Sequence, residues 1–273
     1  MLAIILPAIL AGIVAILVTL AIERFGGLIG GVLGTIPSTI IPAAGVYYLD
    51  GKQALLSSMS IVPLGMMVNG LFLGVWIVLP KYVSNRKSPL VLTTISSISI
   101  WAIFAYLALE IANYTSSVEL SPFILGVLGL IFLIFISIFF NIKTLPSPKG
   151  TNKVPLPILI SRGIAASIAI GCALILANLG EPLVAGLASA FPAIFLTSMI
   201  ALWISQGVTV PQGAAAPMML GGASVAVYAL VVMWSIPSFG IIMGSLIAWL
   251  SSIVFWSIPA FIILKKYRDS SIN

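Results

Sequence analysis

The sequence contains no histidine and a single cysteine, Cys172, among its 273 residues. Histidine is the commonest general base and metal ligand, so its absence removes the usual chemistry of hydrolases and zinc enzymes. One cysteine excludes a disulfide within this sequence, and its apolar surroundings are typical of a small buried hydrophobic residue. No spacing of nucleophile and base, or of metal ligands, appears elsewhere. We therefore expect neither an enzyme nor a protein that holds a cofactor or metal.

Charged residues are also scarce, at 7% of the sequence against about 25% in an average soluble protein. Hydrophobic residues make up 61%, and the mean hydropathy is +1.25. A surface with so few charges must face lipid, which predicts an integral membrane protein. The net charge of +6 does not indicate nucleic-acid binding, because the basic residues form no track that could follow phosphates.

The apolar residues fall into nine stretches, each about as long as the ~20 helical residues that cross a bilayer core. The first has no basic residues before it and is longer than the apolar part of a secretory signal, so we interpret it as a retained span. The predicted fold class is all-α, a polytopic membrane protein with about nine transmembrane helices. The expected spans are 2–23, 27–49, 53–80, 89–112, 121–141, 158–179, 182–204, 210–236 and 239–264.

The basic residues predict how these spans are oriented. With nine spans, eleven of the twelve lie on one side of the membrane, and Lys52 alone lies on the other. Cytoplasmic loops are enriched in lysine and arginine, so the N-terminus is expected outside and the C-terminus in the cytoplasm. The eleven are Arg24, Lys81, Arg86, Lys87, Lys143, Lys149, Lys153, Arg162, Lys265, Lys266 and Arg268.

Two segments far apart in the sequence resemble each other. Residues 27–38 and 182–193 share a pattern of apolar and small residues, and leucine, glycine and proline coincide at three positions. If spans one to four match spans six to nine, the offset of five spans inverts the second half in the membrane. The expected domains are a four-helix repeat at 1–112, a connecting helix with a Pro-rich cytoplasmic linker at 113–157, and an inverted four-helix repeat at 158–273.

Prolines at matching places in the two halves, Pro37 with Pro192 and Pro63 with Pro217, predict interrupted helices. Proline removes a backbone donor and frees a carbonyl, and inside lipid such groups need partners. A hydrated cavity supplies them, and interrupted helices in inverted repeats indicate a transporter site near the bilayer midplane. The alternative is that these prolines only kink their helices for packing.

Polar side chains near these prolines are the candidate substrate-binding residues. Hydroxyls and amides can coordinate an anion or a neutral polar solute, although serine and threonine also bond back to their own helix. No charge is expected at mid-depth, which argues against a cation. Glu110, near the outer end of its span, is either a proton carrier or a residue that reaches the interface. The candidates are Ser38, Thr39, Asn69, Thr197, Ser198 and Gln212.

Glycines recur every four residues near the second span, as Gly26, Gly30 and Gly34 and as Gly27 and Gly31. Glycine faces let helices approach one another closely. These faces predict packing within the chain, a homo-oligomer or a contact with another membrane protein. A glycine-lined passage is the alternative.

Residues 23–41, a glycine-rich segment followed by Pro37, resemble the glycine-then-proline segment of the GlpM-like small bacterial membrane proteins. Those proteins are about half as long, so the resemblance implies a fused duplicate. Residues 50–58 resemble the repeat segment of the sulfite-exporter TauE/SafE family, and the expected architecture is similar to that of the family. This resemblance implies two inverted four-helix repeats and export of sulfur-containing organic or inorganic anions. The run of three adjacent glycines found in that family is absent here.

Three hypotheses for function follow from these patterns. The leading one is a secondary transporter or exporter of a small anionic or neutral polar solute, with its site at the interface between the repeats. The second is a non-transporting membrane scaffold or assembly subunit that packs against partners through its glycine faces. The third is a passive channel. The expected partners are the lipid bilayer and a small solute.

Overall fold

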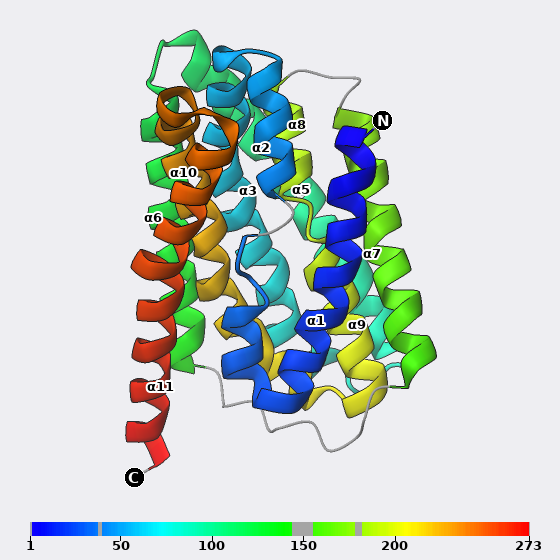
Figure 1. The fold of residues 1–273 in the computed structure, drawn as a ribbon. Coiled ribbons are helices and arrows are strands. Elements are labelled where there is room, and N and C mark those ends of the chain that lie inside the picture. The colour runs from blue at the N-terminus through cyan, green and yellow to red at the C-terminus, as the bar shows by residue number, and fades with distance from the viewer. Residues whose placement is uncertain (1, 38–39, 144–154, 178–181, 273) are drawn as a thin grey trace.

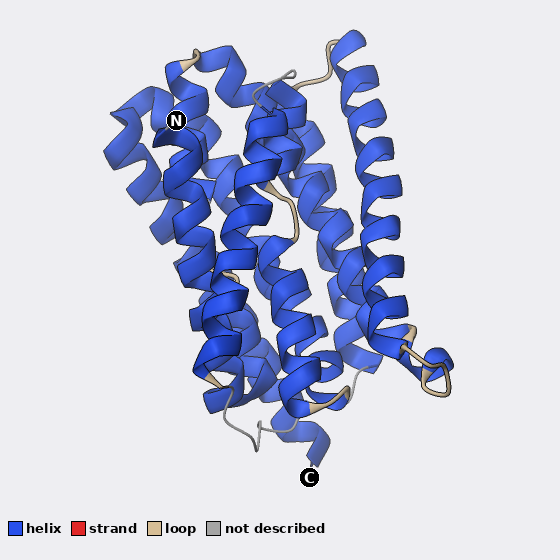
Figure 2. Ribbon diagram, turned by 90° about the vertical axis from the view of Figure 1, so that its right-hand side faces the viewer, coloured by secondary structure: helices blue, strands red, loops and turns tan. Residues whose placement is uncertain are grey.

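A computed structural model describes residues 2–37, 40–143, 155–177 and 182–272, and within these ranges the chain is helical with no strand. The expected all-α class is confirmed for this part of the chain. Figures 1 and 2 show one bundle of roughly parallel helices with the two termini at opposite ends. The elements are α1 (Leu2–Leu33), α2 (Ile40–Leu49), α3 (Lys52–Val78), α4 (Pro80–Val83), α5 (Pro89–Ser117), α6 (Pro122–Lys143), α7 (Leu156–Ala177), α8 (Pro182–Ser189), α9 (Ala193–Gln206), α10 (Thr209–Ser252), a π-helical turn η1 (Ile253–Ser257) and α11 (Ile258–Ile272).

Five helical segments of the described chain are long and apolar enough to cross a membrane. The outward faces of α5 and α6 carry exposed apolar side chains such as Ile103, Phe132 and Phe135, where a helix in water would carry charges. These features are consistent with a membrane protein whose outer surface faces lipid. The five segments are Lys52–Val83, Pro89–Ser117, Pro122–Lys143, Pro182–Gln206 and Thr209–Tyr267.

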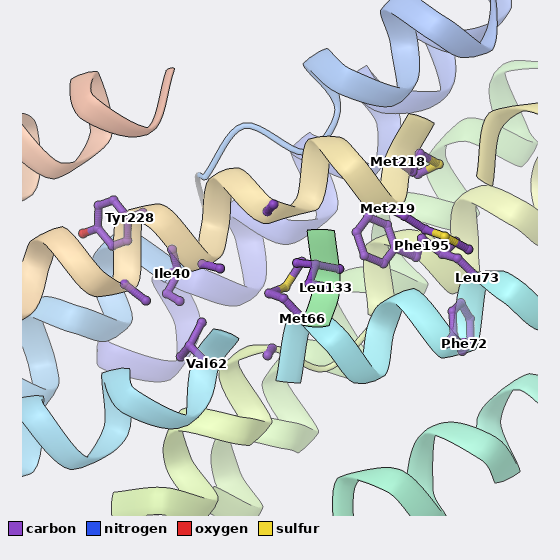
Figure 3. Packing of buried hydrophobic residues seen from close by; sticks show 14 of the residues in the cluster. Ile40, Val62, Met66, Phe72, Leu73, Leu133, Phe195, Met218, Met219 and Tyr228 are labelled. Atoms are coloured by element: carbon purple, nitrogen blue, oxygen red, sulfur yellow. The ribbon is translucent and has the colours of Figure 1, made fainter. Parts of the chain in front are cut away.

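Helix α3 lies at the centre of the bundle. Its sequence is apolar on every side, which predicts a helix that is buried on every side. It packs against α5, α6, α8 and α10. Met66 and Phe72 of α3 belong to one apolar cluster with Leu133 of α6, Phe195 of α9 and Met219 of α10 (Figure 3). Helices α3 and α10 therefore form the framework around which the other helices pack.

The two turns expected at residues 24–26 and 237–238 lie within the bounds of α1 and α10 in the structure. Helix α1 continues through residues 24–26, and Figure 1 shows it turning at the lower end of the bundle so that its last residues lead back upward. Helix α10 continues past residue 236 but is kinked at Gly240, which has φ 78° and ψ 172°. In Figure 1 the chain turns downward after α10 has reached the upper part of the bundle. Glycine adopts this conformation at little steric cost, which explains how the turn fits inside an otherwise helical segment.

Pro63 and Pro217, which were expected to interrupt their helices, do not. Both lie inside helices that continue past them, α3 and α10. Helix α6 braces the chain beside each proline. A Cβ at Gly129 would lie 2.8 Å from the Pro63 carbonyl carbon, and Asn141 Nδ2 donates to the Ala216 carbonyl at 2.8 Å. Proline is tolerated in a membrane helix where a neighbouring helix packs closely and offers polar side chains.

Candidate functional site

Two helices are interrupted near the middle of the bundle. The first helix interruption, which includes residues 34–37, separates α1 from α2, and the second, residues 190–192, separates α8 from α9 (Figure 1). Residues 38 and 39 of the first lie outside the described part of the chain. Proline donates no backbone hydrogen bond and disfavours helical geometry in the residue before it. Each helix accordingly ends within a turn before a buried proline, Pro37 or Pro192.

The two interruptions meet at one cavity of about 60 Å³, called here the central cavity. A cavity of this size has room for a few water molecules. Its wall combines apolar side chains with backbone groups that the interruptions release from helical bonding. It is lined by Gly34, Thr35, Ile36 and Pro37 of the first interruption, by Ser189, Ala190, Phe191 and Pro192 at the second, and by Val14, Ile40, Met66, Asn69, Ile170, Ile194, Phe195 and Val225.

Asn69 of α3 holds the second interruption from the cavity wall. Its Nδ2 donates to the Ala190 carbonyl at 2.8 Å, and its Oδ1 accepts a hydrogen bond from Trp101 Nε1 at 2.9 Å. The ring of Trp101 meets Phe191 edge-on, with centroids 5.0 Å apart. Asn69 is 3% exposed, so it supplies inside the protein a bond that the Ala190 carbonyl would otherwise lack.

Ser224 of α10 makes the corresponding contact with the first interruption. Its Oγ donates to the Thr35 carbonyl at 2.7 Å. The two pairs of residues are related by one offset along the chain, because 190 minus 35 and 224 minus 69 both equal 155. A helix in each half of the chain therefore donates to the interruption in the other half.

The same offset relates further residues at the site. Pro37 and Pro192 are 155 positions apart, and so are Trp101 and Trp256 (256 minus 101). Both tryptophans donate from Nε1 to the helix that holds an interruption, Trp101 to α3 and Trp256 to the Leu220 carbonyl of α10 at 2.7 Å. The cavity-lining residues 34–37 match 189–192 under the same offset.

Helices α2 and α9 both begin at the central cavity, which Ile40 of α2 and Ile194 of α9 line. The first amides of a helix have no partner within it, and the N-terminus carries a partial positive charge. With 10 and 14 residues, both helices are long enough for this effect. No charged side chain of the described chain lines the cavity. The local field therefore favours an anion or the electron-rich end of a polar solute.

The residues expected at the site divide between the cavity and other places. Asn69 lines the central cavity, whereas Ser38 and Thr39 lie outside the described residues. Gln212 does not line the cavity: its Nε2 donates to the Ile77 carbonyl at 3.3 Å and ties α10 to the far end of α3.

Thr197 and Ser198 point along α9 rather than into the cavity lining. Their hydroxyls donate to the carbonyls of Ala193 and Ile194, four residues earlier in the same helix. This is the local bonding that serine and threonine commonly make in helices. Glu110, the candidate proton carrier, is exposed on α5 and also lies away from the cavity.

The cavity includes polar residues that the sequence reasoning passed over. Thr35 and Ser189 precede their prolines by two and three residues, whereas the polar residues singled out in these segments followed them. A proline disfavours helical geometry on its N-terminal side rather than on its C-terminal side. The residues before each proline were therefore the better candidates. Ser224 could have been found from Asn69 by applying the offset between the two prolines, Pro37 and Pro192.

Comparison with known proteins identifies no relative, since no family model, curated protein or solved structure matches the chain. The functional conclusion therefore depends on the geometry of the two interruptions and on the chemistry of the residues around them.

Proposed function

We propose that the chain is an integral membrane secondary transporter or exporter of a small anionic or neutral polar solute, which binds in the central cavity. The observation that carries the proposal is that two interrupted helices meet at one cavity, each held by a helix of the other half. Interrupted helices at the interface of inverted repeats are the typical site of secondary transporters, because their free backbone groups and helix ends bind the solute.

The two halves form an inverted repeat with the organisation 4+1+4, in which α6 is the connecting helix. In Figure 1, α2 leads from the first interruption toward the end of the bundle that holds the N-terminus, and α9 leads from the second interruption toward the opposite end. Helices α3 and α10 likewise begin at opposite ends of the bundle and run in opposite directions. These opposed directions and the constant offset of 155 positions (190 minus 35) support a duplication whose second copy is inverted. Counting each interrupted helix as one crossing, the chain crosses the membrane nine times.

The orientation follows from the exposed basic residues. Lys81, Arg86 and Lys87 follow α3 at the end of the bundle that also holds the C-terminus, and all three are exposed. Lys52 begins α3 at the other end. With the positive end in the cytoplasm, the N-terminus lies outside and the C-terminus inside.

The interruptions divide the cover of the cavity into two parts. From the two interruptions, α2 and α8 extend toward the end of the bundle that holds the N-terminus, and α9 and the last turns of α1 lie toward the end that holds the C-terminus (Figure 1). A tilt of one half against the other opens one side while it closes the other, which is alternating access. Asn69 and Ser224 keep each interruption attached to the opposite half during this motion.

The test is solute flux into proteoliposomes that contain the purified chain. The panel includes sulfite, methanesulfonate and acetate as anions, the first two because of the TauE/SafE resemblance, and glycerol as a neutral solute. Saturable uptake with counterflow is expected for at least one of them, and Asn69→Leu abolishes it while Asn113→Leu, an exposed position on α5, does not. Flux without saturation or counterflow indicates a channel. Vesicles that stay tight to every solute contradict the proposal.

The scaffold hypothesis receives less support from the described glycines. Gly12 of α1 packs on Gly163 of α7, Gly129 of α6 packs on α3, and Gly186 of α8 packs on Ser58 of α3. These glycines pack against other helices of the same chain, so none of them is available for contact with a partner protein. The side-chain environments of residues 26, 27, 30 and 31 lie outside the described part, whereas residue 34 lines the cavity.

A further inference from the structure

Arg162, one of the eleven basic residues that the sequence predicts on the cytoplasmic side, is buried in the bundle. It is 4% exposed, and no other charged side chain of the described chain is buried. It lies on the same face of α7 as Leu159, Ala166 and Ile170, which are buried too. Residues three and four positions apart share one face of a helix, so the apolar pattern of α7 turns Arg162 inward.

The Arg162 guanidinium has few partners in this position. Its Nη2 donates to Ser198 Oγ of α9, while Nε and Nη1 have no hydrogen-bond partner. No carboxylate of the described side chains compensates the charge, because all four are exposed; these are Asp50, Glu110, Glu119 and Asp269. A buried charge without a counter-charge and with unused donors is strongly unfavourable, and more so within a membrane. An anion bound at this point removes both costs.

The unused donors match a particular kind of ligand. Nε and Nη1 carry three N–H groups held in the plane of the guanidinium. This rigid arrangement fits the oxygens of a carboxylate, sulfonate or phosphate group, and the charge strengthens each bond. The Ser198 hydroxyl, which now donates to the Ile194 carbonyl, lies beside the guanidinium and can turn to donate to the same anion.

The position of Arg162 connects it with the central cavity. Ser198 follows the cavity-lining residue Ile194 by one turn of α9, about 6 Å along the helix axis. Arg162 precedes the cavity-lining residue Ile170 by two turns of α7, about 12 Å along its axis. Both displacements run toward the C-terminal end of the bundle (Figure 1).

We propose that Arg162 and Ser198 form a binding site for a small oxyanion, between the central cavity and the C-terminal end of the bundle. The identification of this anion with the transported solute rests on the proposed function, whereas the binding site itself does not. The oxyanion group belongs either to a free solute or to the phosphate of an anionic lipid, and the experiment separates these two sources.

The experiment measures anion binding to the full chain, purified in a neutral detergent and stripped of anionic lipid. Thermal unfolding is followed as sulfate, inorganic phosphate or acetate is added at constant ionic strength. A ligand that binds the folded state alone raises the unfolding temperature in a saturable way. This rise is expected for at least one of the three anions. In a second arm the protein is titrated with phosphatidylglycerol, and saturation by this lipid alone identifies the phosphate source as lipid.

Variants locate the binding site. Arg162→Met removes the charge at similar length and is expected to abolish the anion response, while the unfolding temperature without anion stays equal or rises. Arg162→Lys keeps the charge without the planar donors and is expected to weaken apparent affinity about tenfold, as is Ser198→Ala. Arg86→Met, the same substitution at an exposed position, is expected to leave the response unchanged. If Arg162→Met cannot be purified, Arg162→Lys decides the question.

Three outcomes overturn the inference. One is the absence of a saturable response to any of the anions or to the lipid, and another is an unchanged response in Arg162→Met or, failing that, in Arg162→Lys. The third is a response that appears in the protein only after Glu23→Gln or Glu181→Gln, since an internal carboxylate would then be the partner. Failure of the transport assay alongside Arg162-dependent binding removes the proposed function and leaves the site. Transport without Arg162-dependent anion binding supports the proposed function and contradicts the binding site.

Discussion

At each of the two helix interruptions, a side chain from a distant helix donates a hydrogen bond to a backbone carbonyl, but the side chains differ. At the second, Asn69 donates to the Ala190 carbonyl and also accepts from Trp101. At the first, Ser224 donates to the Thr35 carbonyl and has the shorter side chain. An asparagine and a serine are unrelated by type, yet each supplies one donor to one freed carbonyl. What the two halves share is therefore a hydrogen bond at a given place, and the second interruption depends on a larger network than the first.

The largest expected effect comes from Asn69→Leu, which removes the network at the second interruption. The Ala190 carbonyl and the partly buried Trp101 indole N–H then lose these partners, at about 1–3 kcal/mol each, so the free energy of unfolding in detergent falls by about 2–6 kcal/mol. The exposed control Asn113→Leu is expected to change it by less than about 0.5 kcal/mol. A loss below about 1 kcal/mol for Asn69→Leu would mean that this residue does not hold the interruption.

Gly186→Ala tests the packing beside the second interruption. It is expected to displace α8 from α3 and to leave the first interruption unchanged. A Cβ at this position would lie 2.0 Å from the Ser58 carbonyl oxygen of α3, which cannot give way easily. The expected cost is about 1–3 kcal/mol in thermal or denaturant unfolding. The control is Gly171→Ala, whose Cβ would meet Ala8 Cβ at 3.7 Å and is expected to be neutral or slightly stabilising. Equal effects of the two substitutions contradict the close packing of α8 on α3.

Ser224→Ala tests the first interruption and is expected to cost less than Asn69→Leu. The substitution removes the Ser224 donor from the Thr35 carbonyl. The free energy of unfolding is expected to fall by about 1 kcal/mol. Ser97→Ala on α5 is the matched control, since the Ser97 hydroxyl is buried but bonds within its own helix. If both serine variants are equally stable, the bond between α10 and the first interruption contributes nothing measurable.

The smallest expected effect is the difference between Trp101→Phe and Trp256→Phe. Both variants lose an indole N–H. Trp101→Phe leaves the buried Asn69 Oδ1 without this donor, whereas Trp256→Phe removes a donor from the Leu220 backbone carbonyl within α10. Trp101→Phe is therefore expected to destabilise more, by about 0.5–1 kcal/mol, in the same unfolding assay. The reverse order would show that the Trp256 bond contributes more than the bond from Trp101 to Asn69.

The sequence predicts the helical class and the approximate spans, because long apolar runs in lipid leave the backbone few alternatives. It does not decide which prolines interrupt a helix. Pro37 and Pro192 lie where helices stop, while Pro63 and Pro217 lie inside α3 and α10, which α6 braces. Proline acts on the residues beside it, but the bracing comes from residues of another helix far away in the chain. No local pattern contains that information.

The site is predictable to a smaller degree. Asn69 was found because it is an amide within an apolar span, and it lines the cavity. Thr197 and Gln212 are also polar and also near a proline, but one bonds to its own helix and the other to the Ile77 carbonyl of α3. Polarity near a proline marks a residue that needs a partner, and the fold determines whether that partner is a backbone carbonyl or a solute.

Composition and the length of the apolar runs by themselves determined an all-helical chain with an apolar outer surface, since peptide groups surrounded by lipid must bond within their own helix. The tertiary structure decided which interruptions meet and which carbonyls Asn69 and Ser224 reach. It also decided that Arg162 lies inside the bundle rather than at its surface. The physical reason is that each of these outcomes depends on the approach of helices that are distant in the chain, and close packing between them is a property of the whole bundle.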